Sequence, residues 1–343
     1  MGEENKIEKI LSASRIKNLE SCTWSYWCKY HLGLPETNNE GAMRGSICHL
    51  VFELIQTKKH KNHFKLITKE NRIEASPAVT RLVNKHLNAY GINTEENYEL
   101  INDMILVGLH DDFYCKGSTL LDPEYEFKIE NENPKYTVRG FIDKAAKYPK
   151  QKKILIKDYK SSKKKFEGDD LTANIQGMIY SLVATKVWPK LKPVVEFCFL
   201  KYPKEPIQRL EFSQQELSGL ESYLAHVYSI INNFTEETAR SGFAADKPFP
   251  KKDEGFKGPL NCGFAKHKGQ LKKDGSVMWH CPFKFDFDYY ALVDEHGVQL
   301  KTAFKENELT ASEGQKIIKL KYDGCPKHTQ QSTESKSDND FGF

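Results

Sequence analysis

The sequence predicts an α/β fold, in which helices flank a mixed central sheet. Residues 124–160 hold three consecutive runs of alternating apolar and polar side chains separated by short polar turns, a pattern typical of neighbouring strands. Runs with helical spacing lie on either side, at 44–57 and 169–188, and another β-rich run follows at 194–200. The order helix, three strands, helix, strand indicates one layered α/β core.

The first element is an amphipathic helix over residues 44–57, RGSICHLVFELIQT. Its apolar residues, among them Ile47, Val51 and Ile55, stand near helical spacing. Further apolar residues at helical spacing follow within residues 58–118, so this stretch is expected to be a helical insertion.

The three strands are EYEFKIE from residue 124, YTVRGFIDKAA from residue 136 and KKILIKDYK from residue 152. The turn NENP separates the first two, and a turn at Pro149 separates the last two. A helix over 169–188 follows, and then the β-rich run VVEFCFL, which ends at Leu200.

The remaining chain predicts a C-terminal elaboration. Ser213 to Glu216, SQQE, form a capping box that opens a helix reaching to about residue 234. Lysine, glycine and proline dominate 245–275, which reads as loop, and short aromatic strands are expected within 276–304. We therefore expect three regions: a core with its insertion over 1–205, an elaboration packed on that core over 206–326, and a disordered acidic-aromatic tail over 327–343.

Composition excludes a membrane protein and does not decide the partner. Charged residues make up 29% of the 343 residues, and no uncharged apolar run approaches the roughly 18 residues that span a bilayer. The first twenty residues lack a secretory signal, so a cytoplasmic protein of a bacterium or a phage-infected cell is expected. The net charge of +4 is too small to indicate a nucleic-acid partner.

Two aspartates and a lysine suggest metal-dependent chemistry in the strands. Asp143 ends one apolar strand, and Asp158 lies near the end of the next, with Lys160 two residues later on the same strand face. Two carboxylates can hold Mg²⁺ at about 2.1 Å, and an ammonium beside the ion can orient the attacking water. An isolated D-x-K is more often a pair of ordinary strand-end charges.

Other residues could join this centre or have ordinary structural roles. Gln176 and Tyr180 stand at i and i+4 on one helix face, where they could contact a DNA phosphate, brace the metal site or simply be half-buried. His49 could complete a metal shell or be a core histidine. Glu126 could be a further acid near the centre or an edge-strand charge.

These motifs together resemble the RecB-like branch of the PD-(D/E)XK nuclease superfamily. They are Gly45 to His49, Gly140 to Asp143, Asp158 to Lys160 and Gln176 to Tyr180, in that order, and the opening ILSASRIKNLESCTWSYWCKYHLGLP is similar to the family's N-terminal segment. The resemblance covers residues 12–50 and 124–202.

The resemblance implies a restriction-endonuclease-like core, and it implies a role for each residue of the site. His49, Asp143 and Asp158 would bind Mg²⁺, with Mn²⁺ able to substitute, and Lys160 would assist the nucleophilic water. The implied activity is metal-dependent DNA cleavage, and an exonuclease of the exonuclease V kind, acting in recombination, repair or phage genome processing, is preferred. A structure-specific endonuclease and a non-cleaving DNA-binding scaffold are the alternatives.

The cysteines depart from the pattern of relatives that hold an iron–sulfur cluster. Cys22 matches the first cluster position, but Cys262, Cys281 and Cys325 are widely spaced and contain no C-x-x-C. A cluster is therefore not expected, and a zinc site or free thiols remain alternatives.

The C-terminal residues, SDNDFGF, resemble the tails with which replication proteins dock on partners. A single-strand-binding, recombinase or replication protein is the partner they suggest.

Overall fold

The structure is a computed structural model that describes residues 9–37, 39–247 and 260–329. The chain divides into two compact units. The first, called here the sheet unit, comprises Ile10–Ala13 and Asn38–Tyr228. The second, called the C-terminal unit, comprises Met1–Lys9, Ser14–Thr37 and Ser229–Phe343. Most of the tail expected over 327–343 lies outside the described residues.

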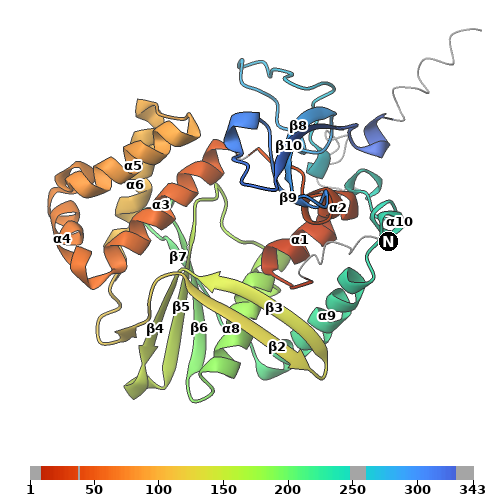
Figure 1. The fold of residues 1–343 in the computed structure, drawn as a ribbon. Helices are drawn as coiled ribbons and strands as arrows, with labels where there is room; N and C mark the ends of the chain where they lie inside the picture. Colours follow the sequence, from red (N-terminus) through yellow and green to blue (C-terminus); the bar gives the residue numbers. More distant parts are fainter. Residues whose placement is uncertain (1–8, 38, 248–259, 330–343) are drawn as a thin grey trace, which may run out of the picture. The chain divides into compact units, whose positions relative to one another are not determined.

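The α/β class predicted from the sequence is confirmed by a mixed sheet in the sheet unit (Figure 1). Its strand order is β1-β4-β5-β6-β7. Strands β5 and β6 are parallel, and the other neighbours are antiparallel. The bounds are Thr119–Leu120 for β1, Lys144–Tyr148 for β4, Lys153–Lys160 for β5, Lys192–Phe199 for β6 and Ile207–Leu210 for β7.

The middle of the three predicted strands is divided at Asp143. Strand β3, Lys135–Ile142, pairs with β2, Tyr125–Glu132, in a two-stranded antiparallel ribbon. Strand β4 begins one residue after Asp143 and pairs with β5. Gly140 allows the ribbon to close, because a Cβ there would lie 2.6 Å from the Phe127 ring. Asp143 therefore stands where the chain leaves the ribbon for the sheet.

Two capped helices stand on either side of these strands in the sequence. Helix α3 covers Glu40–Gln56 and begins at Asn39, whose side chain accepts a hydrogen bond from Ala42 N–H. The short α7 covers Asp169–Thr172, and α8 covers Ile175–Val187 with Asn174 as its cap. Helix α8 packs on β6. Its Gly177 lies close to Phe197 of that strand.

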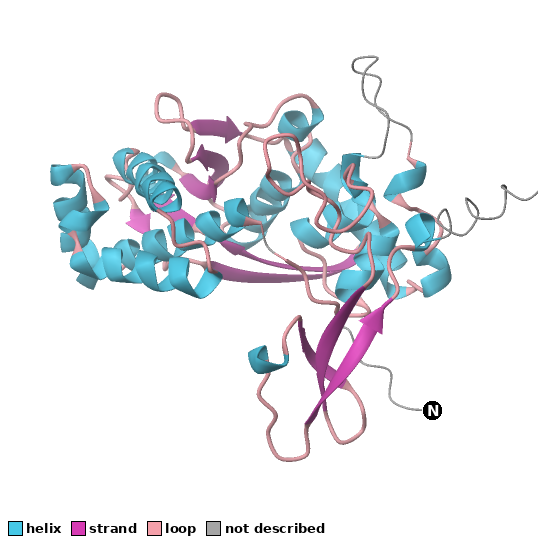
Figure 2. Cartoon of the chain, turned by 90° about the horizontal axis from the view of Figure 1, so that it is seen from above, coloured by secondary structure: helices cyan, strands magenta, loops and turns pink. Residues whose placement is uncertain are grey.

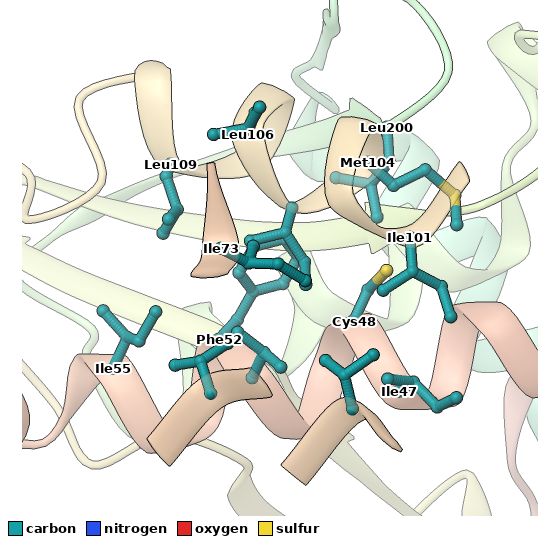
Figure 3. Close-up of a cluster of buried hydrophobic side chains, with 14 of the residues drawn as sticks. Ile47, Cys48, Phe52, Ile55, Ile73, Ile101, Met104, Leu106, Leu109 and Leu200 are labelled. Atoms are coloured by element: carbon teal, nitrogen blue, oxygen red, sulfur yellow. The ribbon is translucent and has the colours of Figure 1, made fainter. Parts of the chain in front are cut away.

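The insertion expected over 58–118 is helical. It contains α4 (Lys61–Glu70), α5 (Pro77–Tyr90) and α6 (Glu95–His110), which lie together with α3 in Figure 1 and again as cyan helices in Figure 2. Figure 3 shows how they are held: side chains of α3 and α6 point toward one another and form a buried cluster. Cys48 is part of this core, which accounts for one of the free thiols.

The C-terminal unit joins the two ends of the chain. Helices α1 (Ala13–Ser21), α2 (Thr23–Tyr30) and α10 (Glu236–Ala239) accompany a sheet of order β10-β8-β9. Its strands cover Phe287–Val293 for β8, Gln299–Ala303 for β9 and Lys316–Tyr322 for β10. The Trp24 indole N–H donates to the Tyr322 hydroxyl at 2.9 Å. The N-terminal helices thus pack with the C-terminal strands, although the sequence grouped them with the core.

Helix α9 covers Gln214–Asn232 and contributes to both units. The predicted capping box opens it: Ser213 N–H donates to the Glu216 carboxylate at 2.7 Å, and Glu216 N–H donates to Ser213 Oγ at 3.2 Å. Short 3₁₀ turns occur at Lys58–His60, Ile73–Ala75, Pro149–Gln151, Ala244–Asp246, Leu260–Cys262 and Glu306–Glu308. Among the described residues, no helix combines the length and apolarity needed to cross a bilayer.

Candidate active site

Asp143 and His49 meet at the break between β3 and β4. Asp143 Oδ2 accepts a hydrogen bond from Tyr159 N–H at 2.7 Å and lies 3.4 Å from His49 Nδ1. His49 Nε2 lies 3.0 Å from the Tyr159 carbonyl oxygen. Burial lowers the pKa of His49, but the Asp143 carboxylate outweighs burial, and the pKa rises to about 9. The imidazole therefore carries a proton near neutral pH, in a place suited to positive charge.

Gly45 explains how His49 reaches this position. It lies one helical turn before His49, and a Cβ at residue 45 would stand 2.5 Å from Ser161 Oγ. Only glycine lets α3 approach the end of β5 this closely without a shift of Ser161. The Gly45 to His49 spacing is thus a packing requirement that brings the imidazole toward β5.

Asp158 is buried on β5, and its two oxygens have different surroundings. Oδ1 accepts hydrogen bonds from Gln176 Nε2 at 2.7 Å and from the Tyr180 hydroxyl at 2.9 Å. Oδ2 forms an ion pair, at 2.7 Å, with Lys160 Nζ. Burial raises the pKa of Asp158, the Asp143 charge raises it further, and Lys160 opposes both. A second cation beside Oδ2 would relieve this cost.

Gln176 and Tyr180 brace Asp158 from α8. The Gln176 amide donates to Asp158 and accepts from Lys160 Nζ at 2.7 Å, so it fixes both charged groups. The Tyr180 hydroxyl also lies 3.0 Å from the Phe141 carbonyl oxygen, and the ring is buried. Of the roles considered for this pair, these contacts favour bracing over contact with a phosphate.

The structure brings one unexpected acid to the centre. Ligand atoms of His49, Glu124 and Asp143 all lie within 4.8 Å of one another. Burial and the Asp143 charge raise the pKa of Glu124. Its backbone φ of +51° is unusual for glutamate, and its N–H donates to the Asp143 carbonyl at 3.3 Å.

Glu126, the acid singled out in the sequence, has a different environment. Its carboxylate is half exposed and pairs with Arg139 across the β2–β3 ribbon, with a hydrogen bond of 2.7 Å from Nε. It therefore does not join the group formed by His49, Glu124 and Asp143. Glu124 comes two residues earlier, just before β2, and no motif in the sequence marked it.

An open groove of about 570 Å³ runs beside these residues. Its wall includes His49 and Glu124 together with Ser46, Tyr90 and Ser161, all within the sheet unit. His49 and Glu124 are therefore accessible from solvent on one side, as a polymeric substrate requires.

The donor set fits a small divalent cation. Carboxylate oxygens with one imidazole suit Mg²⁺ or Mn²⁺, and Asp158 adds a buried carboxylate whose Oδ2 already faces the positive charge of Lys160. His49 presents a protonated ring nitrogen toward Asp143, and a cation could replace that proton between the same two groups.

The C-terminal unit contains a second group of candidate ligands. Cys22, Cys262, Cys281 and Cys325 all line one cavity of about 40 Å³. His328 also lines it, and its Nε2 is buried without a hydrogen-bond partner among the described residues. Burial raises the thiol pKa to about 12 for Cys281 and about 11 for Cys262 and Cys325. Residues that are widely spaced in the sequence are thus neighbours in space.

The distances between the cysteine sulfurs can be compared with those that a single zinc ion requires. Within the described residues, no three cysteine sulfurs lie within 4.8 Å of one another. A single tetrahedral zinc with Zn–S bonds of about 2.3 Å needs closer sulfurs than that. The described sulfurs therefore do not form a closed site for a single zinc ion.

Comparison with known proteins identifies the family of the fold. A family model described as the PD-(D/E)XK nuclease superfamily matches residues 10–254. None of the curated proteins matches the chain. Among solved structures, the crystal structure of a candidate exonuclease from Eubacterium rectale is similar, with 13% identity and a TM-score of 0.43. The similarity covers 73% of this chain and 96% of that one.

Proposed function

The chain belongs to the PD-(D/E)XK nuclease superfamily, and from this premise we propose that it is a Mg²⁺-dependent DNA exonuclease. Mn²⁺ would substitute for Mg²⁺. The observation that carries the proposal is a pair of neighbouring contacts, His49 with Asp143 and Lys160 with Asp158, in which the charge of Asp143 acts on the buried Asp158 carboxylate.

Each residue then has a distinct role. His49, Asp143 and Asp158 would hold the cation, and Glu124 joins them as a further carboxylate ligand. The cation would supply Lewis-acid polarisation of the phosphate and would acidify water. Lys160, held by Asp158 and Gln176, directs its ammonium to the same point, where it can orient the nucleophile or neutralise developing charge. Tyr180 keeps Asp158 in place.

The order of the motifs supports the RecB-like branch, and exonuclease activity follows from that resemblance. Recombination, repair or phage genome processing would be the setting. A structure-specific endonuclease would use the same centre and differ only in the substrate that it admits. A scaffold that does not cleave is disfavoured, because both aspartates, the histidine and the lysine stand together.

Digestion of end-labelled linear DNA and closed circular DNA, each in Mg²⁺ and in EDTA, tests the proposal. We expect the linear DNA to be degraded only in Mg²⁺ and the circle to survive. Asp158→Asn keeps the shape of the side chain and removes its charge, so cleavage should be abolished. Asp103→Asn on the exposed side of α6 is the matched control and should cleave like the parent. Cut circles would favour the endonuclease, and intact linear DNA would favour the scaffold.

We also propose that the four cysteines of the C-terminal unit bind an iron–sulfur cluster. The spacing in the sequence argued against a cluster, but the cavity that all four cysteines line supports one, and the His328 Nε2 at the same cavity has no hydrogen-bond partner among the described residues. Four thiolates are the usual ligands of such clusters. The role would be structural, joining Cys22 near the N-terminus to three C-terminal positions.

For the acidic-aromatic end of the chain we propose docking on a single-strand-binding, recombinase or replication protein. Asp338, Asp340, Phe341 and Phe343 offer negative charge and two aromatic anchors. Deletion of residues 334–343 should leave cleavage of naked DNA unchanged and should weaken co-purification with such a partner.

A further inference from the structure

Residues 263–280 form a hairpin within the C-terminal unit, and the active-site proposal assigns it no role. Its ends are joined by the bridge between Gly263 and His280 and by a hydrogen bond of 3.1 Å from Cys281 N–H to the Cys262 carbonyl. The far end is closed by a bridge between Leu271 and Val277. The hairpin is thus an ordered element with a defined root and tip.

Large apolar side chains on this hairpin face solvent. Trp279 is 52% exposed, and Leu271, Val277 and Phe264 are also more than one-third exposed. One edge of the Trp279 indole lies close to the backbone at Gly263. A Cβ at Gly263 would lie 3.0 Å from Trp279 Cε3 and 2.4 Å from its carbonyl oxygen, and Gly263 has a φ of +70°. Glycine at this position lets the indole lie against the backbone with its outer side uncovered.

The same hairpin carries several positive charges. Lys266, Lys268, Lys272 and Lys273 are exposed, whereas Asp274 is the one acidic residue of the hairpin. The Asp274 carboxylate accepts hydrogen bonds from Ser276 N–H at 2.9 Å and Oγ at 2.6 Å and so belongs to the turn. Among the residues that the structure describes, none of the four lysines forms an ion pair. Lys268 Nζ lies 5.9 Å from the centroid of the Phe287 ring, and all four lysine side chains are exposed, so they can contact a polyanion.

We propose that this hairpin binds single-stranded nucleic acid. Bases would stack on the Trp279 indole, and lysines would contact the phosphates. An exposed ring with lysines around it is the combination that binds unpaired strands without sequence preference, because every base has a face for stacking. A paired duplex would hide those faces. This inference rests on the proposed function for the identity of its ligand, but it concerns a surface on the other unit and does not need the active site.

Binding can be measured without cleavage. The full chain carrying Asp158→Asn would be titrated into a labelled oligothymidylate of roughly 20 nucleotides, longer than the about 4–16 nucleotides that one binding domain covers. Fluorescence anisotropy in Ca²⁺ gives the Kd. Adding Trp279→Ala should raise Kd about tenfold, because stacking on one ring contributes about 1–3 kcal/mol. Trp279→Phe keeps a ring and should retain most of the affinity.

The lysines are tested by the salt dependence of Kd. Lys272→Ser with Lys273→Ser should lower the slope of log Kd against log salt by about 1.4, since each single-strand phosphate contact contributes about 0.7. Leu300→Ala with Lys301→Ser removes an exposed apolar and an exposed basic side chain from β9 of the same unit and is the matched control. This control should leave both Kd and slope unchanged.

Three results would overturn the inference. These are a parent chain that binds no oligothymidylate, a Trp279→Ala variant within twofold of the parent, and a control variant that weakens binding as much as the hairpin variants do. If the hairpin variants bind oligothymidylate as the parent does, the exposed surface of the hairpin would serve another partner, such as a protein. Because no readout depends on cleavage, a failure here is distinct from a failure of the nuclease proposal.

Discussion

Lys160 is the residue whose contacts best separate catalysis from metal binding. Its ammonium lies 2.7 Å from both Asp158 Oδ2 and Gln176 Oε1. Lysine is not one of the candidate metal ligands, which are histidine and carboxylate side chains. We expect Lys160→Ala to lower kcat by about 10²–10⁴, the usual contribution of a positioned proton-transfer group. Metal affinity measured by calorimetry should not fall, since no anionic ligand is lost.

Lys160→Arg should not restore activity, because a planar guanidinium cannot take the place of a compact ammonium between those two acceptors. A Lys160→Ala protein that no longer binds Mg²⁺ would assign the lysine a structural role.

The two neighbouring glutamates provide a matched test of the metal group. Glu124 lies with His49 and Asp143, whereas Glu126 pairs with Arg139 on the ribbon. Glu124→Gln removes one negative charge from the group and should weaken Mg²⁺ or Mn²⁺ binding by about tenfold or more, measured by calorimetry. Glu126→Gln should bind metal like the parent. Equal effects of the two variants would show that Glu124 influences metal binding only through its negative charge at long range and not as a ligand.

Among individual residues, the sequence motifs predict that His49, Asp143, Asp158 and Lys160 form one site. The structure places His49 beside Asp143 and Lys160 beside Asp158. Glu124 was missed, because its role depends on a left-handed backbone at the start of β2 and not on a side-chain pattern. Glu126 stood at a more conspicuous strand position and finds its partner in Arg139.

At the scale of elements, the approach of α3 to β5 can be tested through Gly45. Alanine ordinarily stabilises a helix relative to glycine by about 1 kcal/mol, but here its Cβ would meet Ser161 Oγ at 2.5 Å. We expect Gly45→Ala to lower kcat/KM by displacing His49 from Asp143. Gly45→Ala with Ser161→Gly removes the clash and should recover much of the activity.

Gly219→Ala is the control for the glycine prediction. This residue lies in α9, and a Cβ added there would meet no described atom within 4 Å. The substitution should therefore raise the free energy of unfolding by about 1 kcal/mol and leave activity unchanged. Denaturant unfolding measures the first effect, and a nuclease assay measures the second. Full activity in Gly45→Ala would mean that Ser161 simply turns aside.

Most elements follow from periodicity and caps, as the helix at 44–57 and the capping box at Ser213 illustrate. Strand β3 was predicted to continue through Asp143, because an alternating pattern does not reveal that one half pairs with β2 and the other with β5. Pairing partners are set by contacts distant in sequence. The break between β3 and β4, where the candidate ligand Asp143 lies, could therefore not be predicted from the local sequence pattern.

At the scale of the whole chain, the cysteines provide a test of long-range assembly. Protein purified without oxygen should contain iron together with the visible absorption of an iron–sulfur cluster. Cys281→Ala and Cys325→Ala each remove one cavity thiol and should lose the iron, whereas Cys198→Ala, buried in the sheet unit, should retain it. One equivalent of zinc would favour a single-ion site. Protein that contains neither iron nor zinc would show that the four cysteines are free thiols.

The same cysteines show where sequence reasoning stops. Their spacings in the chain matched no compact metal motif, and only folding brings Cys22 to the cavity that Cys262, Cys281 and Cys325 line. The packing of α1 and α2 with β10 is another case, since the Trp24 to Tyr322 hydrogen bond joins residues from opposite ends of the chain. Linear distance carries little information about such contacts.

The narrow root of the 263–280 hairpin also has an evolutionary consequence. Because the chain departs and returns at hydrogen-bonded neighbours, a longer, shorter or wholly different segment could replace the hairpin at little cost to the rest of the protein. Loop exchange between related proteins would then alter which strands are captured while the chemistry stays the same. Substrate preference could thus evolve, or be engineered, by exchanging this one segment of the chain.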